Sequence, residues 1–374
     1  MKKILQVTTV SLSLGFITEH IKLLINEKNI IDIATNVIEP IKEGVVPDGV
    51  DIKQIEFQRN PFSLKNFYAY KKIKKIYREN KYDIVHVHTP VAAFLTRLAL
   101  RKENGVKVIY TAHGFHFYKG ANLLNWLLYY PLEKIAAKWT DIIITINQED
   151  YDNANKFKLR NRGKVYKVNG VGVKEEDYKI NNFNRNLYRK NLKLEEDDFV
   201  ILVLAELNKN KNHIQLIKAM SLLKDKYPNI KAIFAGVGPL EEKIKKQIKE
   251  NGLEGKISLL GWRNDVKELI NLSDVVGLFS KREGLGKCLL EAMLCGKCVI
   301  ATNTRGPREL IEQDINGFMF EIDDIESTAK SIEKIYIDNN LRNKFEEKVV
   351  DTANKYLLDN VLKQLSEVYE NLYK

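Results

Sequence analysis

The side chains best suited to chemistry lie in residues 280–293, where a glycine-rich loop follows an apolar strand and opens a helix. Gly284 and Gly286 let the backbone approach a ligand closely, and the free N–H groups at the start of the helix form a phosphate site. Glu291 lies one to two turns inside the helix, where its carboxylate could accept hydrogen bonds from ribose hydroxyls. Glu283, in the loop, would face the other end of the ligand. The stretch therefore predicts a nucleotide site.

The elements that must position this stretch are short apolar, β-branched runs that alternate with amphipathic helical stretches. Runs of this kind are typical of parallel strands covered on both faces, and the alternation favours a doubly wound α/β sheet. In the first half of the chain we expect strands at 4–10, 30–37, 84–88, 106–111 and 141–146, with helices at 18–29, 64–80, 91–101 and 123–138.

A polar stretch at 173–198, which contains Asn181, interrupts the alternation and is expected to be an interdomain linker. A second cycle follows, with strands at 200–206, 231–235, 257–260, 275–279 and 298–301, helices at 213–224, 240–250 and 286–295, and a helical end at 325–374. We therefore expect two Rossmann-like β/α/β domains that face each other across a cleft, with ligands at the carboxyl ends of the strands. The predicted boundaries are 1–175, 176–355, and a helix at 356–374 that returns to the N-terminal domain.

Length and composition indicate a globular protein with two domains. The chain has 374 residues, of which 44% are hydrophobic and 29% charged, whereas one domain usually has about 100–200 residues. These values exclude a mostly disordered or fibrous chain, and no apolar run approaches the roughly 18 residues of a membrane span. The first ten residues are expected to form a strand and not a signal peptide. Cys288, Cys295 and Cys298 form no disulfide framework, which favours a cytoplasmic setting.

The net charge is +11, from 60 Lys and Arg against 49 Asp and Glu. Nucleic acid, an anionic membrane surface and phosphorylated substrates all suit such a balance. The charge alone does not choose among these partners.

The two glutamates are separated by seven residues and lie among glycines, an Ala-Met pair and then Cys295-Gly296. This pattern resembles the E-x7-E signature of the family-four retaining glycosyltransferases, which have the GT-B fold. Further matches follow in the family's order along nearly the whole chain: D-x-x-H-x-H at 83–88, T-x-H-G at 111–114, N-G-V at 169–171, a basic segment at 205–212, and a segment at 305–317. The run at 111–120 is similar to bacterial capsule and exopolysaccharide transferases in particular.

The resemblance implies transfer of a sugar, with retention at the anomeric carbon, from a nucleotide-diphosphate donor, for which UDP is the expected nucleotide. Family members follow a front-face route, in which the leaving phosphate accepts the acceptor's proton, and need no metal or other cofactor. Glu283 would orient donor-sugar hydroxyls, Lys211 would stabilise charge on the diphosphate, and His113 would hydrogen-bond the donor sugar or phosphate. The expected donor contacts are Glu291, Gly284, Leu285, Gly286, Lys287, Lys209 and Asn169, while Gly15 marks a loop that contacts donor or acceptor.

The chain departs from the family's pattern at two places. The glycine-rich N-terminal loop is reduced to residues 11–15 with the single glycine Gly15. The phosphate-binding arginine is replaced by Glu206, whose carboxylate cannot hold a diphosphate. Lys211 is therefore expected to carry more of that task, with Lys209 as a helper.

No metal site is expected. Asp150 and Asp152 have D-x-D spacing, but carboxylates after a strand more often favour the start of a helix. Cys295 and Cys298 have CxxC spacing without the second pair that a zinc site needs. The strand-end histidines at 86 and 88 are expected to be packed residues.

Two stretches of the N-terminal half suit a lipid interface. Residues 59–78 interleave basic and aromatic side chains, and residues 118–130 are apolar and aromatic. Such surfaces match an anionic membrane, although part of each must pack on the sheet. With the resemblance, they favour a peripheral enzyme on the inner face of the plasma membrane, with a polyprenyl-diphosphate-linked sugar as acceptor in the N-terminal domain.

Three other functions compete with this hypothesis. A UDP-sugar 2-epimerase of similar fold would turn over the donor without an acceptor, and the E-x7-E context argues against it. A non-catalytic GT-B relative is disfavoured because Lys211, Glu283 and Glu291 are retained. Nothing beyond charge indicates a nucleic-acid-binding protein, since no recognition motif is present; we expect no nucleic-acid partner.

Overall fold

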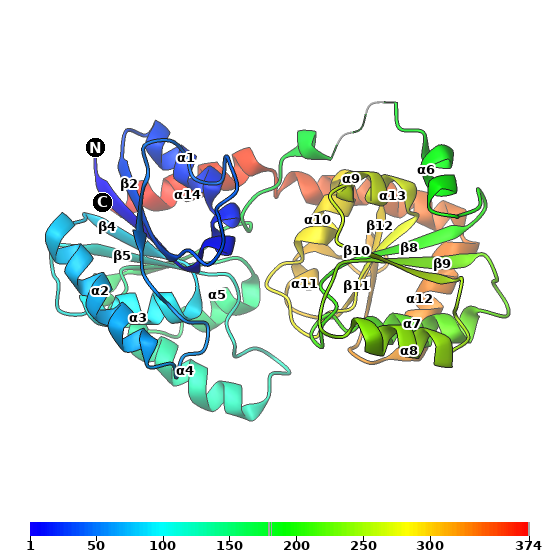
Figure 1. The fold of residues 1–374 in the computed structure, drawn as a ribbon, viewed down its shortest axis with the longest axis horizontal. Coiled ribbons are helices and arrows are strands. Elements are labelled where there is room, and N and C mark those ends of the chain that lie inside the picture. Colours follow the sequence, from blue (N-terminus) through cyan, green and yellow to red (C-terminus); the bar gives the residue numbers. More distant parts are fainter. Residues whose placement is uncertain (179, 181, 373–374) are drawn as a thin grey trace. The chain divides into compact units, whose positions relative to one another are not determined.

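The structure is a computed structural model that describes residues 1–178, 180 and 182–372. It divides into a first unit, Met1–Gly172 with Leu358–Lys374, and a second unit, Val173–Leu357 (Figure 1). The sequence placed these boundaries two to three residues away, after 175 and after 355. The division falls where it does because Val173 pairs with Leu357 in a β-bridge and its N–H donates to Tyr356 O.

The first unit is built on a seven-stranded parallel sheet with the order β3-β2-β1-β4-β5-β6-β7. Its strands are β1 (Lys3–Val10), β2 (Ile30–Asn36), β3 (Asp51–Gln54), β4 (Ile84–Val87), β5 (Lys107–Ala112), β6 (Ile142–Thr145) and β7 (Lys164–Lys167). Its helices are η1 (Ser11–Phe16), α1 (Thr18–Asn26), α2 (Lys65–Asn80), α3 (Pro90–Leu100), α4 (Leu123–Ala137), α5 (Gln148–Ala154), η2 (Arg160–Arg162) and α14 (Leu358–Asn371).

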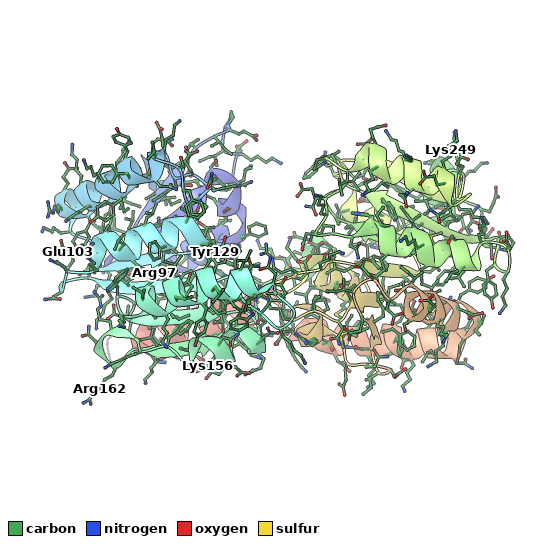
Figure 2. All side chains as sticks on the ribbon, turned by 90° about the horizontal axis from the view of Figure 1, so that it is seen from below. Arg97, Glu103, Tyr129, Lys156, Arg162 and Lys249 are labelled. Atoms are coloured by element: carbon green, nitrogen blue, oxygen red, sulfur yellow. The ribbon has the colours of Figure 1, made fainter. Side chains whose placement is uncertain are left out.

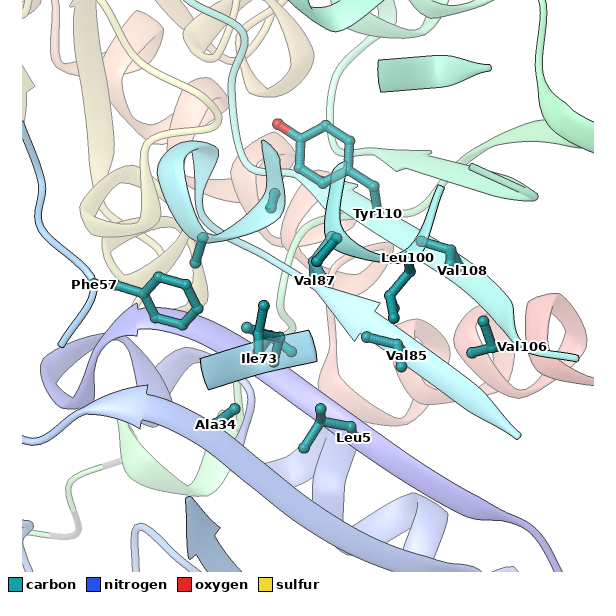
Figure 3. Close-up of a cluster of buried hydrophobic side chains, with 14 of the residues drawn as sticks. Leu5, Ala34, Phe57, Ile73, Val85, Val87, Leu100, Val106, Val108 and Tyr110 are labelled. Carbon is teal, nitrogen blue, oxygen red and sulfur yellow. The ribbon is translucent and has the colours of Figure 1, made fainter. Parts of the chain in front are cut away.

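Helices cover both faces of this sheet because successive strand side chains alternate between faces. Leu5 of β1 belongs to a buried cluster that includes Val85 and Ile73, the latter from α2 (Figure 3). Its neighbour Ile4 belongs to a second cluster, which takes in side chains of α1 and α14 such as Val361. The final helix of the chain therefore completes the core of the first unit.

The second unit repeats this plan with a six-stranded parallel sheet in the order β10-β9-β8-β11-β12-β13. Its strands are β8 (Phe199–Leu204), β9 (Ile230–Ala235), β10 (Ile257–Gly261), β11 (Val275–Leu278), β12 (Cys298–Thr302) and β13 (Gly317–Phe320). Its helices are η3 (Glu175–Asp177), α6 (Arg185–Asn191), α7 (His213–Leu223), α8 (Glu241–Glu250), α9 (Val266–Leu272), α10 (Lys287–Leu294), α11 (Pro307–Leu310), α12 (Ile325–Ile337) and α13 (Asn339–Asn354).

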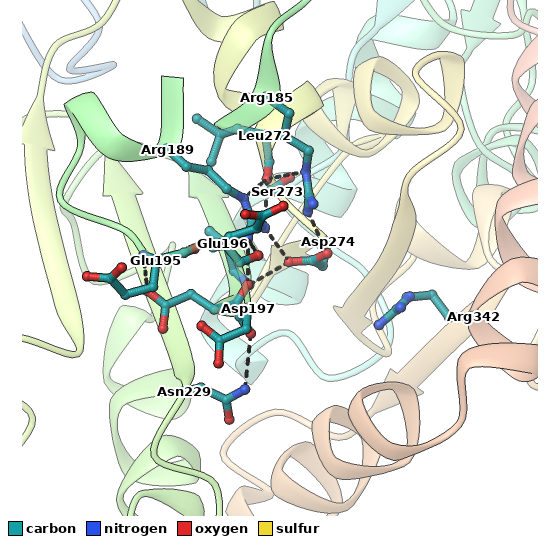
Figure 4. A network of polar contacts seen from close by, with 12 residues as sticks. Arg185, Arg189, Glu195, Glu196, Asp197, Asn229, Leu272, Ser273, Asp274 and Arg342 are labelled. Carbon is teal, nitrogen blue, oxygen red and sulfur yellow. Dashed lines mark hydrogen bonds and ion pairs between the residues drawn. The ribbon is translucent and has the colours of Figure 1, made fainter. Parts of the chain in front are cut away.

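Residues 173–198 are not a plain linker, which corrects the expectation from composition; Asn181 itself lies outside the described residues. Helix α6 forms within this stretch, and Asn184 caps it by accepting a hydrogen bond from the Leu187 N–H. Arg189 is buried and donates to Leu272 O and to Asp274 Oδ2, the latter at 2.8 Å (Figure 4). Because the loss of one partner of a buried ion pair costs about 3–5 kcal/mol, this network fixes α6 on the second unit.

The helical end at 325–374 also differs from the expectation. It consists of three helices, because Asp338 caps the start of α13 and a short break separates α13 from α14. None of the helices that the structure describes combines the length and apolar character needed to cross a bilayer.

In both sheets the strand order reverses beside the first strand of the unit. The reversal lies between β1 and β4 in the first unit and between β8 and β11 in the second. Parallel sheets bind ligands at such switch points, outside the carboxyl ends of the strands. The loops that follow these four strands are therefore the places to look for a site.

Candidate functional site

Two loops meet at the switch point of the second unit, the one after β8 and the one after β11. The Lys281 N–H donates to Asn210 O at 2.7 Å, and the Asn210 side-chain amide donates to Arg282 O at 3.0 Å. These contacts hold residues 205–212 against residues 280–286. Asn210 was not singled out from the sequence, because its partners are about 70 positions away.

Lys211 and Glu283 form an ion pair across the two loops. Nζ of Lys211 lies 2.6 Å from Oε1 of Glu283, and the two side chains are 24% and 15% exposed. Burial opposes the charged ammonium, but the Glu283 carboxylate outweighs it and raises the pKa of Lys211 above its ordinary value. Lys211 is therefore a held positive charge at neutral pH, at the position where the sequence predicts a diphosphate.

Helix α10 begins directly after this pair. Gly286 occupies its N-cap with φ of +100°, a left-handed conformation that favours glycine, and no side chain caps the helix. The first N–H groups of α10 are therefore left for a ligand or solvent. Leu285 is buried, so only its backbone could contact a donor. Gly306 packs so closely on Leu285 that a Cβ at position 306 would lie 2.7 Å from Leu285 O.

Glu291 faces two partners that the sequence did not foresee. Its Oε1 accepts hydrogen bonds from the Tyr178 hydroxyl at 2.5 Å and from Nζ of Lys287 at 2.9 Å. The Glu291 side chain is only 12% exposed. Burial, together with the Glu291 charge, raises the pKa of Tyr178 well above its ordinary value, so its phenol stays a donor. Both carboxylates of the glutamate pair are thus engaged by neighbouring donors in this structure.

The remaining polar and candidate metal-binding side chains can be assessed one by one. Lys209 and Glu206 are exposed on the loop after β8. Burial raises the pKa of the Cys288 thiol to about 12, which excludes a thiolate nucleophile near neutral pH. In the part of the chain that the structure describes, no group of three or more His, Cys, Asp or Glu side chains could hold a metal ion. Asp150 lies in the first turn of α5, as predicted.

His113 lies just after β5 in the first unit, beside a row of histidines. Its ring centroid is 5.7 Å from that of His88, which is 4.1 Å from that of His86. His86 is fixed on both sides, with Tyr369 Oη and Thr111 Oγ1 each 2.7 Å from a ring nitrogen. Burial, with a smaller contribution from His20, lowers the pKa of His113 to about 4. At neutral pH this ring is a hydrogen-bonding group and carries no charge.

The remaining predicted residues, Asn169 and Gly15, also belong to the first unit. The backbone N–H of Asn169 donates to Oε1 of Gln364 on α14 at 2.9 Å. Gly15 lies in η1, and a Cβ added there would meet no atom within 4 Å. The structure thus gives no steric reason for glycine at that position. It brings Lys211, Glu283, Gly284, Leu285, Gly286, Lys287, Glu291 and Lys209 together in the second unit and places His113, Asn169 and Gly15 in the first.

Comparison with known proteins bears directly on these features. The family model described as "Glycosyl transferase 4-like" matches residues 6–147, and that described as "Glycosyl transferases group 1" matches residues 184–350. The chain is 40% identical to a Bacillus subtilis protein named "Putative glycosyltransferase EpsD", over 84% of this chain and 83% of that protein. It is 30% identical to an Escherichia coli enzyme named UDP-Gal:alpha-D-GlcNAc-diphosphoundecaprenol alpha-1,3-galactosyltransferase, over 75% of this chain and 73% of that enzyme.

Solved structures agree on the fold. Anabaena HepE in complex with UDP and glucose superposes with a TM-score of 0.81 at 20% identity, over 99% of this chain and all of that one. The same family assignment follows from the two parallel Rossmann-like sheets, from both family models and from relatives at 30–40% identity. The chain is a glycosyltransferase that belongs to family four and has the GT-B fold.

Proposed function

We propose that this enzyme transfers a sugar, with retention of configuration, from a UDP-sugar to a polyprenyl-diphosphate-linked saccharide in cell-surface polysaccharide biosynthesis. The observation that carries the proposal is the Lys211–Glu283 pair beside the uncapped start of α10. A cation and free backbone N–H groups at a switch point are what a nucleotide diphosphate requires.

The pairing suggests how the donor would bind. The diphosphate takes the place of Glu283 at Lys211, and the ammonium then faces the charge that develops as the glycosidic bond breaks. Glu283, released from Lys211, accepts hydrogen bonds from hydroxyls of the donor sugar. Glu291 accepts those of the ribose. The neutral His113 keeps the role that the family resemblance gives it, a hydrogen-bond partner of the donor sugar or phosphate.

Retention follows the family's front-face route in this proposal. The leaving phosphate accepts the proton of the acceptor hydroxyl, so no side chain has to act as a strong nucleophile. The positive charge that the leaving group needs comes from Lys211 and the α10 backbone. We therefore expect turnover to need no metal ion, which assays with and without EDTA test directly.

The proposed acceptor class is supported by the printed names of relatives. The Escherichia coli enzyme is named for a diphosphoundecaprenol-linked acceptor. A Campylobacter jejuni transferase, 31% identical over 42% of this chain, is named for a diphospho-undecaprenol-linked one. Exposed leucines on α4 and a row of lysines on α2 fit binding to an anionic membrane from the cytoplasmic side.

Thermal stabilisation by nucleotides tests the donor half of the proposal. UDP at about 100 times its dissociation constant should add about 2.7 kcal/mol of stability, whereas GDP and ADP should add less. Glu291→Ala should lose the UDP effect, and Glu242→Ala, on the exposed face of α8, should keep it. Stabilisation that does not depend on Glu291 would contradict the assigned site.

Product analysis tests the transfer itself. The purified enzyme is given UDP-sugars with and without lipid-diphosphate saccharides, and products are separated by mass. Glycosylated lipid with the anomeric configuration of the donor supports the proposal. Conversion of the donor in the absence of any acceptor would instead favour the epimerase.

A further inference from the structure

A cavity of about 480 Å³ opens in the first unit, and none of the site residues assigned above is among its lining residues. It lies where β1 and β4 end, beside the switch point of that sheet. Its lining comes from the ends of these strands, η1, the segment before α2, the first half of α3, the loop after β5 and the middle of α4. The volume is typical of a small-ligand site, which has roughly 300–1,000 Å³. The apolar lining includes Val10, Phe62, Pro90, Val91, Phe94 and Leu132.

Most polar groups at this cavity already have partners. The hydroxyls of Thr9 and Thr89 are 2.6 Å apart. Glu133 pairs at 2.8 Å with the fully buried Arg97; Figure 2 labels Arg97 on α3 and Tyr129 on α4. The His116 ring stacks on Tyr129, with centroids 4.5 Å apart. The cavity therefore offers few unmet polar contacts to a ligand.

Arg59 is the one cation among the cavity's lining residues that the structure describes. It is exposed at the cavity and has no ion pair or hydrogen bond within the described ranges 1–178, 180 and 182–372. A matching ligand has an apolar body and one anionic head. Leu132 at the cavity is 37% exposed, and Leu128 and Leu124 follow at i−4 and i−8 on the same face of α4. This row offers an apolar path outward for a chain too long for the cavity.

We infer that this cavity binds the isoprenyl units nearest the diphosphate of a polyprenyl diphosphate, with Arg59 on the diphosphate. The inference rests on the proposed function and deepens it, because it assigns the lipid of the acceptor to named side chains. A whole polyprenyl chain does not fit, so the distal units lie along the α4 leucines. The acceptor is then recognised by its lipid stem as well as by its sugar.

Calorimetric titration of the full-length protein with two soluble probes tests this assignment. Farnesyl diphosphate has three isoprene units and isopentenyl diphosphate has one, and both carry the same head. Saturating UDP is present throughout, so that the diphosphate site of the second unit is occupied. Wild type should bind farnesyl diphosphate at least about tenfold more tightly than isopentenyl diphosphate, because more apolar surface is buried.

Matched variants assign the preference to the cavity. Leu132→Asn and, independently, Phe62→Ser should each reduce the farnesyl preference by about threefold or more, because each places a polar group in the apolar lining. Leu127→Asn, which changes a 65% exposed leucine of the same helix outside the cavity, should retain it. Arg59→Gln should weaken both probes by a similar factor, because the diphosphate head is common to them.

Two results would overturn the inference. One is equal binding of the two probes by wild type. The other is an equal loss of preference in Leu132→Asn and Leu127→Asn, which would indicate adsorption to exposed leucines. The nucleotide titration distinguishes failure of this inference from failure of the proposed function. If wild type shows no farnesyl preference but its UDP binding depends on Glu291, only the lipid assignment is wrong. If UDP binding does not depend on Glu291, the donor site alone is wrong.

Discussion

The two switch points of this enzyme share one topology and differ in the side chains that surround them. In the second unit the edge between β8 and β11 is charged, and its charges hold one another through Lys211–Glu283 and Lys287–Glu291. In the first unit the edge between β1 and β4 opens into an apolar cavity with one unpartnered cation, Arg59, within the described chain. The fold therefore sets where a ligand binds, and side chains set which chemistry it meets.

The difference also concerns what must be displaced when a ligand arrives. At the second unit, an anion has to compete with Glu283 for Lys211, so binding exchanges one ion pair for another. At the first unit, an apolar ligand displaces water from an apolar lining, which is favourable by itself. The charged edge is suited to stabilise a transition state, and the apolar edge to hold a substrate.

The largest effect is expected from Lys211→Met, which removes the cation of the charged edge. Loss of one preorganised stabilising group typically lowers kcat by about 10²–10³, and steady-state transfer assays measure it. Lys243→Met, on the surface of α8, is the control and should keep wild-type turnover. A similar fall in kcat for Arg59→Gln would erase the distinction between the two edges, since Arg59 should affect the KM of the lipid acceptor.

The second largest effect is expected on the stability of the two units at low pH. Four histidines of the first unit have pKa values lowered mainly by burial, and that of His20 falls to about 4. Between pH 6.5 and 4 the unfolded chain binds more protons than the native one, so stability falls as the pH falls. His20 alone accounts for about 3 kcal/mol over this window. The second unit has one such residue, His213.

The three tryptophans allow the units to be followed separately. Trp126 and Trp139 lie in the first unit and Trp262 in the second. Urea unfolding at pH 7 and pH 4.5 is monitored by fluorescence in Trp262→Phe, and then in the variant that retains only Trp262. The first unit should lose more stability on acidification. Equal losses would show that the histidine row does not set the acid response.

The third effect concerns the exchange at Lys211. Glu283→Gln removes the charge that competes with the diphosphate, so bare UDP should bind about three- to tenfold more tightly. Turnover should nevertheless fall, because the carboxylate that orients the donor sugar is lost. Calorimetry and transfer assays on the same preparation measure both. Weaker UDP binding would mean that Glu283 supports Lys211 instead of competing with it; Glu242→Gln controls for the change of charge.

The sequence predicted the parts of this arrangement that depend on local pattern. The apolar runs of β4, β8 and β11 are buried throughout or nearly so, and each was expected as a strand. The edge strands β3 and β7 were missed because half-exposed residues leave no apolar run, and the mostly buried edge strand β13 was missed as well. The loop and the two glutamates at 283 and 291 also follow from local spacing.

Contacts between distant residues could not be predicted in this way. Lys211 and Glu283 are 72 positions apart, and Tyr178 and Glu291 are 113 apart. Neither separation has a signature in composition or periodicity. The cavity of the first unit is lined from several segments, each of which reads as an ordinary loop or helix face. Such features follow from the order of the strands, which brings their loops to one edge.

The smallest effect is expected at Tyr178, whose hydroxyl occupies Oε1 of Glu291 at 2.5 Å. If this bond competes with the ribose, Tyr178→Phe frees the carboxylate and should tighten UDP binding by about threefold, below the full strength of a hydrogen bond to a charged group. Tyr188→Phe, which removes a phenol bonded to Asp265 in the same unit, is the matched control. Weaker UDP binding in Tyr178→Phe alone would show the reverse, that the phenol orients Glu291 for the ribose. Either outcome sharpens the contrast with the first unit. In both cases a hydroxyl of the protein already donates to Glu291 on the charged edge, where the ribose would donate once the nucleotide binds.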